Sequence, residues 1–350
     1  MNNGSTLTMM RHVATRRFFA VLVLFVLLFA YFAITQDKFL TSGNIDALLT
    51  GSSILWMVSI GLTFVMLTGG FDLSLGSVMA MSGIAMGTFM NKWGVPLGIG
   101  IILTVLFGLL VGGLVNGVLI GKVGLPFLVV TLGTLTLYGG IVNLWSDGAT
   151  EAIVSKDLTS IAFNHALGIP VPAWIMIGVF LIALYVQRST YFGRDVYAVG
   201  GSPDAARLSG IRVTRILIAV YAIAGMLAAL AGVMQVARIG AASPQVGGQI
   251  IFSAAAAVLL GGTSFSGGVG GVGGTIIGVL LLGTLENGLS VSGVQSYWQQ
   301  IITGVILVAV VTLDRIQTVG WANAFRFARR PPGAPPAPAR PAPAAARPES

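Results

Sequence analysis

Two carboxylates lie in or beside long apolar stretches, where a carboxylate could bind a coupling ion or a polar solute: Asp72 and Glu286. An ionisable residue in such a stretch is a functional candidate by default. Asp72 follows Gly69 and Gly70 and precedes Ser74, a pattern that favours capping of a broken helix over contact with a solute. Glu286 lies near the end of its stretch, where interfacial water could solvate its charge.

Side chains for metal or covalent chemistry are scarce. The chain has no Cys, which leaves no thiolate metal site and no disulfide framework. Its two histidines, His12 and His165, fall outside the apolar stretches, and no nucleophile with a neighbouring base is found within them. The sequence therefore predicts neither a metal site nor an enzyme.

Two glycine patterns resemble nucleotide-binding motifs but lack the required context. Residues 268–273 (GVGGVG) fit a dinucleotide fingerprint, yet no strand and no βαβ unit surround them. Gly121 and Lys122 are followed by Val123, where a phosphate-binding loop requires Ser or Thr. We expect the glycines to open a tightly packed helix, and we expect no cofactor, ATP or Mg, on this chain.

Polar side chains inside the apolar stretches could line a pathway for a polar solute. Amides can exchange hydrogen bonds with such a solute, although they also serve as interfacial anchors or as bonds between helices. The pathway candidates are Asn116, Asn143, Asn287 and Gln299.

The elements that would hold these residues are membrane helices. Hydrophobic residues make up 55% of the chain and charged residues 9%, and the apolar stretches approach the roughly 20 residues that a helix needs to cross a bilayer. The fold class is therefore all-α and integral to the membrane, with about ten transmembrane helices, of which the third and eighth are the least distinct. The expected spans are 17–36, 43–67, 72–91, 97–120, 127–146, 171–187, 214–238, 243–262, 268–291 and 298–316.

The basic residues set the orientation of these spans. A net charge of +8 could indicate nucleic acid, but the basic residues lie in short segments between spans and not in one patch. With the N-terminus in the cytoplasm, 15 of the 19 Lys and Arg residues fall on the cytoplasmic side. Because basic residues are retained in the cytoplasm, both termini are expected there.

An internal repeat accompanies the ten spans. An offset of 171 residues superposes seven glycines on glycines, among them Gly76 on Gly247 and Gly112 on Gly283, and it places Asn116 on Asn287. Spans two to five then correspond to spans seven to ten. Since the shift is five helices, an odd number, the two halves would face opposite ways, as in the inverted repeats of many transporters.

The spans also divide the chain into regions. Residues 1–16 form a cytoplasmic N-terminus, residues 17–316 the transmembrane domain, and residues 188–215 a cytoplasmic loop within it. Residues 317–350, mostly Pro, Ala and Arg toward the end, are expected to form a disordered cytoplasmic tail, because they cannot bury a core.

The loop at 188–215 contains a short capped helix. Ser202 suits the N-cap, Pro203 the first helical position, Asp204 the positive helix end, and Gly210 a left-handed C-terminal cap. The alternatives are a solvated connector or a docking helix for a soluble partner, and the apolar side chains in the segment favour docking. The candidate residues are Ser202, Pro203, Asp204, Ala205, Ala206, Arg207, Leu208, Ser209 and Gly210.

Several ordered segments resemble the membrane permeases of ribose-type, or monosaccharide, ABC importers. Residues 193–201 (GRDVYAVGG) and 205–211 (AARLSGI) are similar to that family's cytoplasmic loop, and residues 68–77 (TGGFDLSLGS) to its signature after span two. Residues 260–264 (LGGTS) and 287–289 (NGL) resemble its later motifs. The resemblance covers about residues 45–315.

The resemblance implies a permease subunit in the bacterial inner membrane that pairs with a second copy. It further implies a separate ABC ATPase on the cytoplasmic face, carrying ATP and Mg, and a periplasmic or extracellular solute-binding protein. The helix at 203–209 would then couple ATP-driven movement to the membrane helices. Nucleotide state and pathway opening would bias each other reciprocally.

Three positions depart from the family pattern and leave the solute open. Ile251 and Ser253 stand where an acidic pair is usual, and Glu286 stands where an Asn is usual. Nucleosides or another small polar solute therefore remain alternatives to a monosaccharide. An ion-coupled secondary transporter is less well supported, because it would need an ionisable residue at the membrane midplane.

Overall fold

The structure is a computed structural model that describes residues 3–153 and 155–319. Most of the predicted tail therefore lies outside the described residues. The chain forms two units, Met1–Val311 and Thr312–Ser350. The helices and sites described below lie in the first unit, and only the last helix continues past residue 311 into the second.

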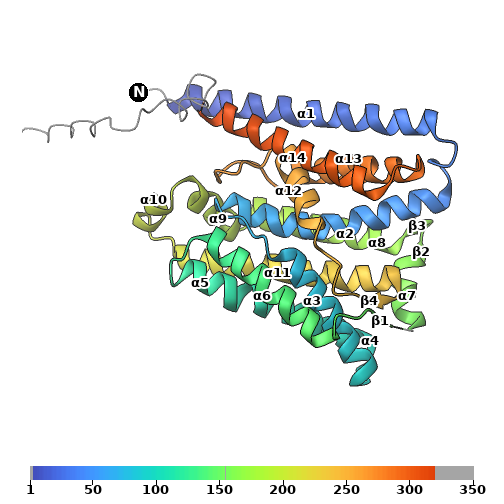
Figure 1. The fold of residues 1–350 in the computed structure, drawn as a ribbon. Helices are drawn as coiled ribbons and strands as arrows, with labels where there is room; N and C mark the ends of the chain where they lie inside the picture. Colours follow the sequence, from blue (N-terminus) through green and yellow to red (C-terminus); the bar gives the residue numbers. More distant parts are fainter. Residues whose placement is uncertain (1–2, 154, 320–350) are drawn as a thin grey trace, which may run out of the picture. The chain divides into compact units, whose positions relative to one another are not determined.

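Long helices dominate the fold, as predicted, and ten helical segments correspond to the ten expected spans (Figure 1). Two of the segments contain stretches of π-helix, η1 (Thr88–Lys92) after α3 and η2 (Val111–Gly117) between α4 and α5. The ten are α1 (Asn3–Thr35), α2 (Ser42–Leu67), α3 (Leu75–Gly87) with η1, α4 (Leu97–Leu110) with η2 and α5 (Val118–Gly121), α6 (Phe127–Ser146), α8 (Val171–Ser189), α11 (Val213–Ile239), α12 (Ile250–Leu260), α13 (Val272–Val291) and α14 (Ser296–Val319).

Seven helical segments among the described residues are long and apolar enough to cross a membrane, and two shorter apolar ones accompany them, Phe19–Thr35 and Ile250–Leu260. Several helices begin away from the expected residue: α1 begins at Asn3 and not at residue 17, and α13 begins at Val272 and not at residue 268. The third helix begins at Leu75 and not at residue 72, and the eighth, α12, covers only Ile250–Leu260 of the expected 243–262. Turns replace its first residues, where Gly247 has a positive φ of 99°. The total of ten crossings stays a prediction.

The core of the first unit is built around α2 and α11. Both helices are buried over most of their length, and α11 packs against α2, α3 and α4. Gly61 permits the close approach, because a side chain there would meet the backbone of Ala224. Buried side chains such as Trp56 fill the remaining space, and its indole N–H donates to the Met176 carbonyl at 3.2 Å. Small residues therefore let the two central helices pack closely.

Contacts between helices recur at the offset of the sequence repeat. Gly112 on η2 lies against Tyr221 and Gly225 of α11, and Gly283 on α13 lies against Ser52 of α2. The equivalent residues Gly76 and Gly247 touch one another, and neither has room for a side chain. The two halves thus use matching positions to contact each other, while their opposite orientation in a membrane stays a prediction.

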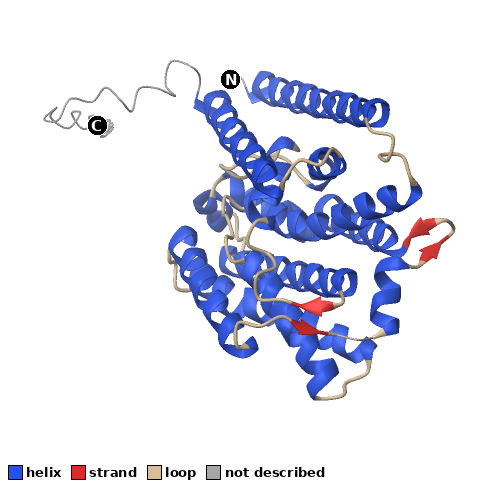
Figure 2. Ribbon diagram, turned by 45° about the vertical axis from the view of Figure 1, so that its right-hand side comes forward, coloured by secondary structure: helices blue, strands red, loops and turns tan. Residues whose placement is uncertain are grey.

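Small elements cap one end of the helices where the sequence suggested only a loop (Figure 2). They are α7 (Lys156–Phe163) and two antiparallel strand pairs, β1 (Glu151–Ala152) with β4 (Ala241–Ala242) and β2 (His165–Ala166) with β3 (Ile169–Pro170). We call this end the hairpin end, after β2 and β3. The opposite end carries α9 (Tyr191–Gly201) and α10 (Pro203–Leu208) and is called the α10 end.

Candidate functional site

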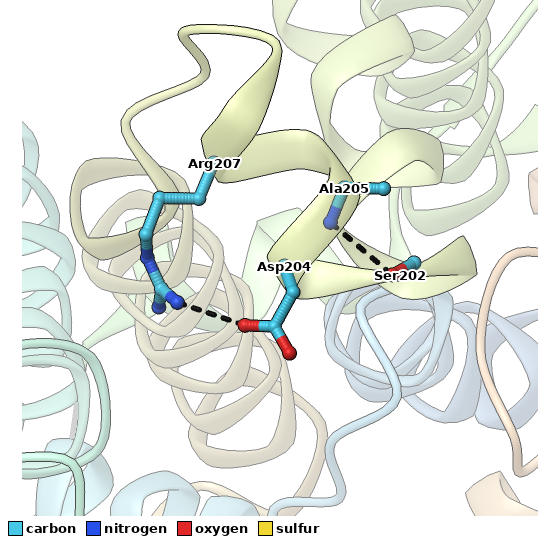
Figure 3. A network of polar contacts seen from close by, with 4 residues as sticks. All are labelled: Ser202, Asp204, Ala205 and Arg207. Atoms are coloured by element: carbon cyan, nitrogen blue, oxygen red, sulfur yellow. Dashed lines mark hydrogen bonds and ion pairs between the residues drawn. The ribbon is translucent and has the colours of Figure 1, made fainter. Parts of the chain in front are cut away.

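The short helix α10 forms as the sequence predicts. Ser202 is its N-cap and accepts a hydrogen bond from the backbone N–H of Ala205 at 3.3 Å, and Pro203 occupies the first position (Figure 3). Asp204 lies in the first turn and pairs with Arg207 at 3.0 Å. Gly210 ends the segment with a φ of 84°. Local capping signals therefore suffice to define this helix.

The apolar side chains of α10 face opposite ways. Ala206 is only 4% exposed and packs inside the chain, whereas Leu208 is 91% exposed. Ala205 is exposed as well. The large apolar side chain available to a partner is therefore that of Leu208, and Ala206 fixes the helix to the rest of the protein.

A second helix, α9, precedes α10 and was not expected from the sequence. Thr190 caps it by accepting a hydrogen bond from the N–H of Gly193 at 3.1 Å. The signal was present, since Thr is a good N-cap residue, but three glycines within the segment argue against a helix. Val196 and Val199 are buried, and they anchor α9 against the protein.

Three glycine-rich segments meet at the α10 end. The N–H of Gly268 donates to the carbonyl of Leu67, the last residue of α2, at 2.9 Å. Gly200 on α9 lies against the same carbonyl, and a side chain there would collide with it. Gly69, with a φ of 79°, turns the chain beside Gly267. The glycines thus bring the end of α2, the α12–α13 connection and α9 into backbone contact.

A hydrogen-bond chain then joins α9 to the start of α13. The Tyr197 hydroxyl donates to the carbonyl of Gly270 at 2.6 Å and accepts from the Gln187 side-chain amide. The amide oxygen of Gln187 accepts from the N–H of Val272, the first residue of α13, at 2.9 Å. Burial raises the pKa of the Tyr197 phenol, although the Gln187 bond and the nearby Arg188 charge oppose the shift. The hydroxyl therefore keeps its proton and can donate.

Asp72 is fully buried and acts within the protein. Its carboxylate accepts from the N–H and the hydroxyl of Ser74, at 2.9 and 2.6 Å. The Asn116 amide approaches the same carboxylate at 3.3 Å and donates to the Ser74 hydroxyl at 2.8 Å. The carboxylate therefore organises the turn before α3 and ties it to η2, while its role as a helix cap stays a prediction.

A cavity of 660 Å³ lies at the hairpin end, among α2, α11, α12, α13 and α14. Its volume is in the range of about 300–1,000 Å³ that is usual for small-molecule sites. Most of the lining side chains are polar, and the principal ones are Asn44, Gln235, Arg238, Ser253, Glu286 and Asn287.

Hydrogen bonds between helices fix several cavity residues. The Asn44 and Asn287 amides donate to each other at 3.0 and 2.9 Å and join α2 to α13. The Ser253 hydroxyl donates to the Glu286 carboxylate at 2.8 Å and joins α12 to α13. The cavity is therefore held in shape by groups that could also bind a polar solute.

The comparison with known proteins matches most of the chain. Residues 44–311 match the family described as the branched-chain amino acid transport system permease component. The chain belongs to this family of permease components. A ribose import permease protein of Haemophilus influenzae is 38% identical over 317 residues, covering 89% of this chain and 97% of its own. No solved structure matches the chain.

Other permeases with similar sequences carry sugar names as well. The ribose import permease protein of Bacillus subtilis is 39% identical over 81% of this chain and 88% of its own. A D-allose transport system permease protein of Escherichia coli is 35% identical over 85% of this chain and 90% of its own.

The permease places its four sequence-predicted pathway residues in different surroundings. Asn287 and Gln299 line the cavity. Asn116 is buried with Asp72, and the Asn143 amide donates to its own helix at Gly139. These two residues are therefore away from the cavity, and their role in a pathway stays a prediction.

Several cavity residues of the permease were missed from the sequence. Arg238 was one of the four basic residues expected on the outer side and nothing more, and Asn44, Ser52 and Gln235 were not singled out. Their position follows from the packing of α2 against α11 and α13, which no local pattern reports. Among the described residues, no group of three His, Cys, Asp or Glu side chains could hold a metal ion.

Proposed function

We propose that this chain is the transmembrane permease subunit of a binding-protein-dependent ABC importer that passes a monosaccharide into the cytoplasm. ATP would be hydrolysed, with Mg, on a partner ATPase. Membership in the permease family and the sugar names of the relatives support the class of transporter. The polar cavity is the observation that carries the substrate class.

The cavity lining favours a polyhydroxylated solute over a branched-chain amino acid. Amide, hydroxyl, carboxylate and guanidinium groups converge on it, and they can pair with hydroxyl groups that both donate and accept. An aliphatic amino-acid side chain would instead need an extended apolar wall, because burying it against polar groups gains little.

The partners and the orientation are also part of the proposal. The α10 end would face the cytoplasm and the ATPase, and the hairpin end would face the solute-binding protein. Both termini would then lie in the cytoplasm, in the inner membrane of a bacterium. The family resemblance supports a second copy of the chain as the partner in the membrane.

Reconstitution tests the proposal directly. Liposomes with the permease, its ATPase and its binding protein should import D-ribose or D-allose, but not L-leucine, only when ATP is supplied on the ATPase side. The permease alone should import nothing under a sodium or proton gradient. Gradient-driven uptake by the chain alone would show a secondary transporter, and import of nucleosides alone would exclude the monosaccharide.

A further inference from the structure

Ser52 lies in the wall of the cavity. Its side chain is 1% exposed, and its oxygen is a buried atom without a hydrogen-bond partner among the described residues. The neighbouring Ser53 instead donates to the Leu49 carbonyl one turn back at 2.7 Å, which is the usual arrangement for a helical serine. The Ser52 hydroxyl faces Gly283 of α13, where both residues line the cavity. A buried hydroxyl in this position lacks an interaction that a ligand could supply.

Two opposite charges flank this hydroxyl. The Arg238 guanidinium reaches Gly51, next to Ser52, since a Cβ at Gly51 would lie 3.5 Å from it. Glu286 follows Gly283 by three residues, which places the two on neighbouring positions of one helix face. Both charged residues line the cavity. The two charges therefore border the same part of the cavity from α11 and α13.

The charges are available because they do not neutralise each other. No ion pair joins Arg238 to a carboxylate within the described part of the chain. One carboxylate oxygen of Glu286 accepts a hydrogen bond from the Ser253 hydroxyl. The other oxygen has no hydrogen-bond donor among the described residues. A guanidinium offers donors and a carboxylate offers acceptors, so together they suit a solute whose hydroxyl groups do both.

We propose that Ser52, Arg238 and Glu286 form a binding station for one neutral sugar within the permease itself. Adjacent hydroxyl groups of the sugar would donate to Glu286 and accept from Arg238, and Ser52 would contact a third. The proposal rests on the proposed function and deepens it, because it assigns part of the substrate selection to this chain as well as to the binding protein.

A cysteine reporter tests the station without the partner proteins. The chain has no native Cys, so Ser290→Cys places a single thiol on the cavity wall, and Ser292→Cys places one outside the lining residues. The full-length permease in liposomes is treated with a methanethiosulfonate reagent, with and without D-ribose. D-ribose should slow the labelling of Ser290→Cys at least tenfold and leave Ser292→Cys unchanged.

Second substitutions identify the residues that hold the sugar. Glu286→Gln, Arg238→Lys and Ser52→Ala should each raise the D-ribose concentration for half-protection, by at least tenfold for the two charged residues, because hydrogen bonds to charged groups are the stronger ones. Glu151→Gln is the matched control, since this carboxylate lies on β1 and not in the cavity. Thermal unfolding of each purified variant shows whether it is folded.

Two outcomes overturn the station. One is the absence of protection by D-ribose and D-allose, and the other is equal protection in the wild-type background and in Glu286→Gln. Protection by L-leucine instead would assign the cavity to amino acids. ATP-driven sugar import without protection would remove the station and leave the proposed function standing, whereas the absence of any sugar import would remove the proposed function.

Discussion

Ala206 and Leu208 lie two residues apart on α10 and point to different surroundings. The sequence alone suggested docking through both, and the structure separates them, because Ala206 is buried and Leu208 is exposed. A substitution of Ala206 therefore tests the packing of α10, while a substitution of Leu208 tests its contact with a partner.

Leu208→Glu should abolish recovery of the ATPase with the permease and should reduce uptake at least tenfold. A carboxylate placed in an apolar interface loses its hydration without gaining a partner. The thermal stability of the isolated permease should stay unchanged, since exposed substitutions usually alter stability by about 0.5 kcal/mol or less. Co-purification and sugar uptake are the measurements.

Two further substitutions, Ala206→Glu and Val123→Glu, are compared with Leu208→Glu. Ala206→Glu should lower the unfolding temperature of the isolated permease, because it buries a carboxylate inside the protein. Val123, exposed in the turn after α5, provides the same change from an apolar residue outside α10. Normal recovery of the ATPase with Leu208→Glu would leave α10 as a solvated connector.

Asp72 supplies a second test at the scale of single residues. Asp72→Ala should destabilise the permease by about 1–3 kcal/mol or more, because Ser74 and Asn116 lose a buried acceptor. Asp72→Asn, which keeps one acceptor oxygen, should cost less. Thermal unfolding of the detergent-solubilised protein measures both, with the exposed Asp37→Ala as control. Intact stability together with lost transport would instead indicate that the carboxylate contacts the solute.

At the scale of elements, α13 connects the two ends of the protein. Its first residue is bonded to Gln187 at the α10 end, and Glu286 and Asn287 near its other end line the cavity. Its 20 residues span about 30 Å at 1.5 Å per residue. The hydroxyls of Thr63 and Thr275 bond α13 to α2 at 2.9 Å between these ends. Movement of α9 can therefore reach the cavity through packed helices.

Tyr197→Phe should uncouple ATP hydrolysis by the partner ATPase from sugar import by the permease. It removes the hydroxyl that donates to Gly270, so ATPase stimulation by the binding protein should persist while sugar imported per ATP falls several-fold. Tyr185→Phe on the exposed face of α8 is the matched control. Because burial raises the Tyr197 pKa, the phenol stays a neutral donor, and wild-type coupling should not change between about pH 7 and 9. Wild-type coupling in Tyr197→Phe would exclude this route.

The elements differ in how far the sequence predicts them. Capping signals at Ser202 and Gly210 act within one turn, and they located α10 correctly. The start of α12 was misplaced because it depends on the contact between Gly76 and Gly247, which are far apart in the chain. The cavity was not predictable for the same reason: Ser52, Arg238 and Glu286 come from three helices whose packing has no local signature.

At the scale of the whole molecule, the two halves of the repeat use equivalent polar positions differently. Equivalent helices of the two halves meet at matching glycines, yet only the second half brings Gln235, Arg238 and Glu286 to a cavity. In the first half, the counterpart of Asn287 is Asn116, which is used to hold Asp72. Similar scaffolds thus hold a structural polar cluster around Asn116 and a polar cavity around Asn287, and α2 of the first half also lines that cavity.

The orientation of the molecule gives the last prediction. If the basic residues set the topology, α7 at the hairpin end faces outward and α10 faces the cytoplasm. Lys156→Cys should then react with a membrane-impermeant thiol reagent in intact cells, and Arg207→Cys should react only after permeabilisation. Both residues are exposed and the chain has no other Cys, so access to the reagent decides the result. The opposite pattern would invert the molecule, direct the cavity toward the cytoplasm and rule out α10 as the contact for a cytoplasmic ATPase.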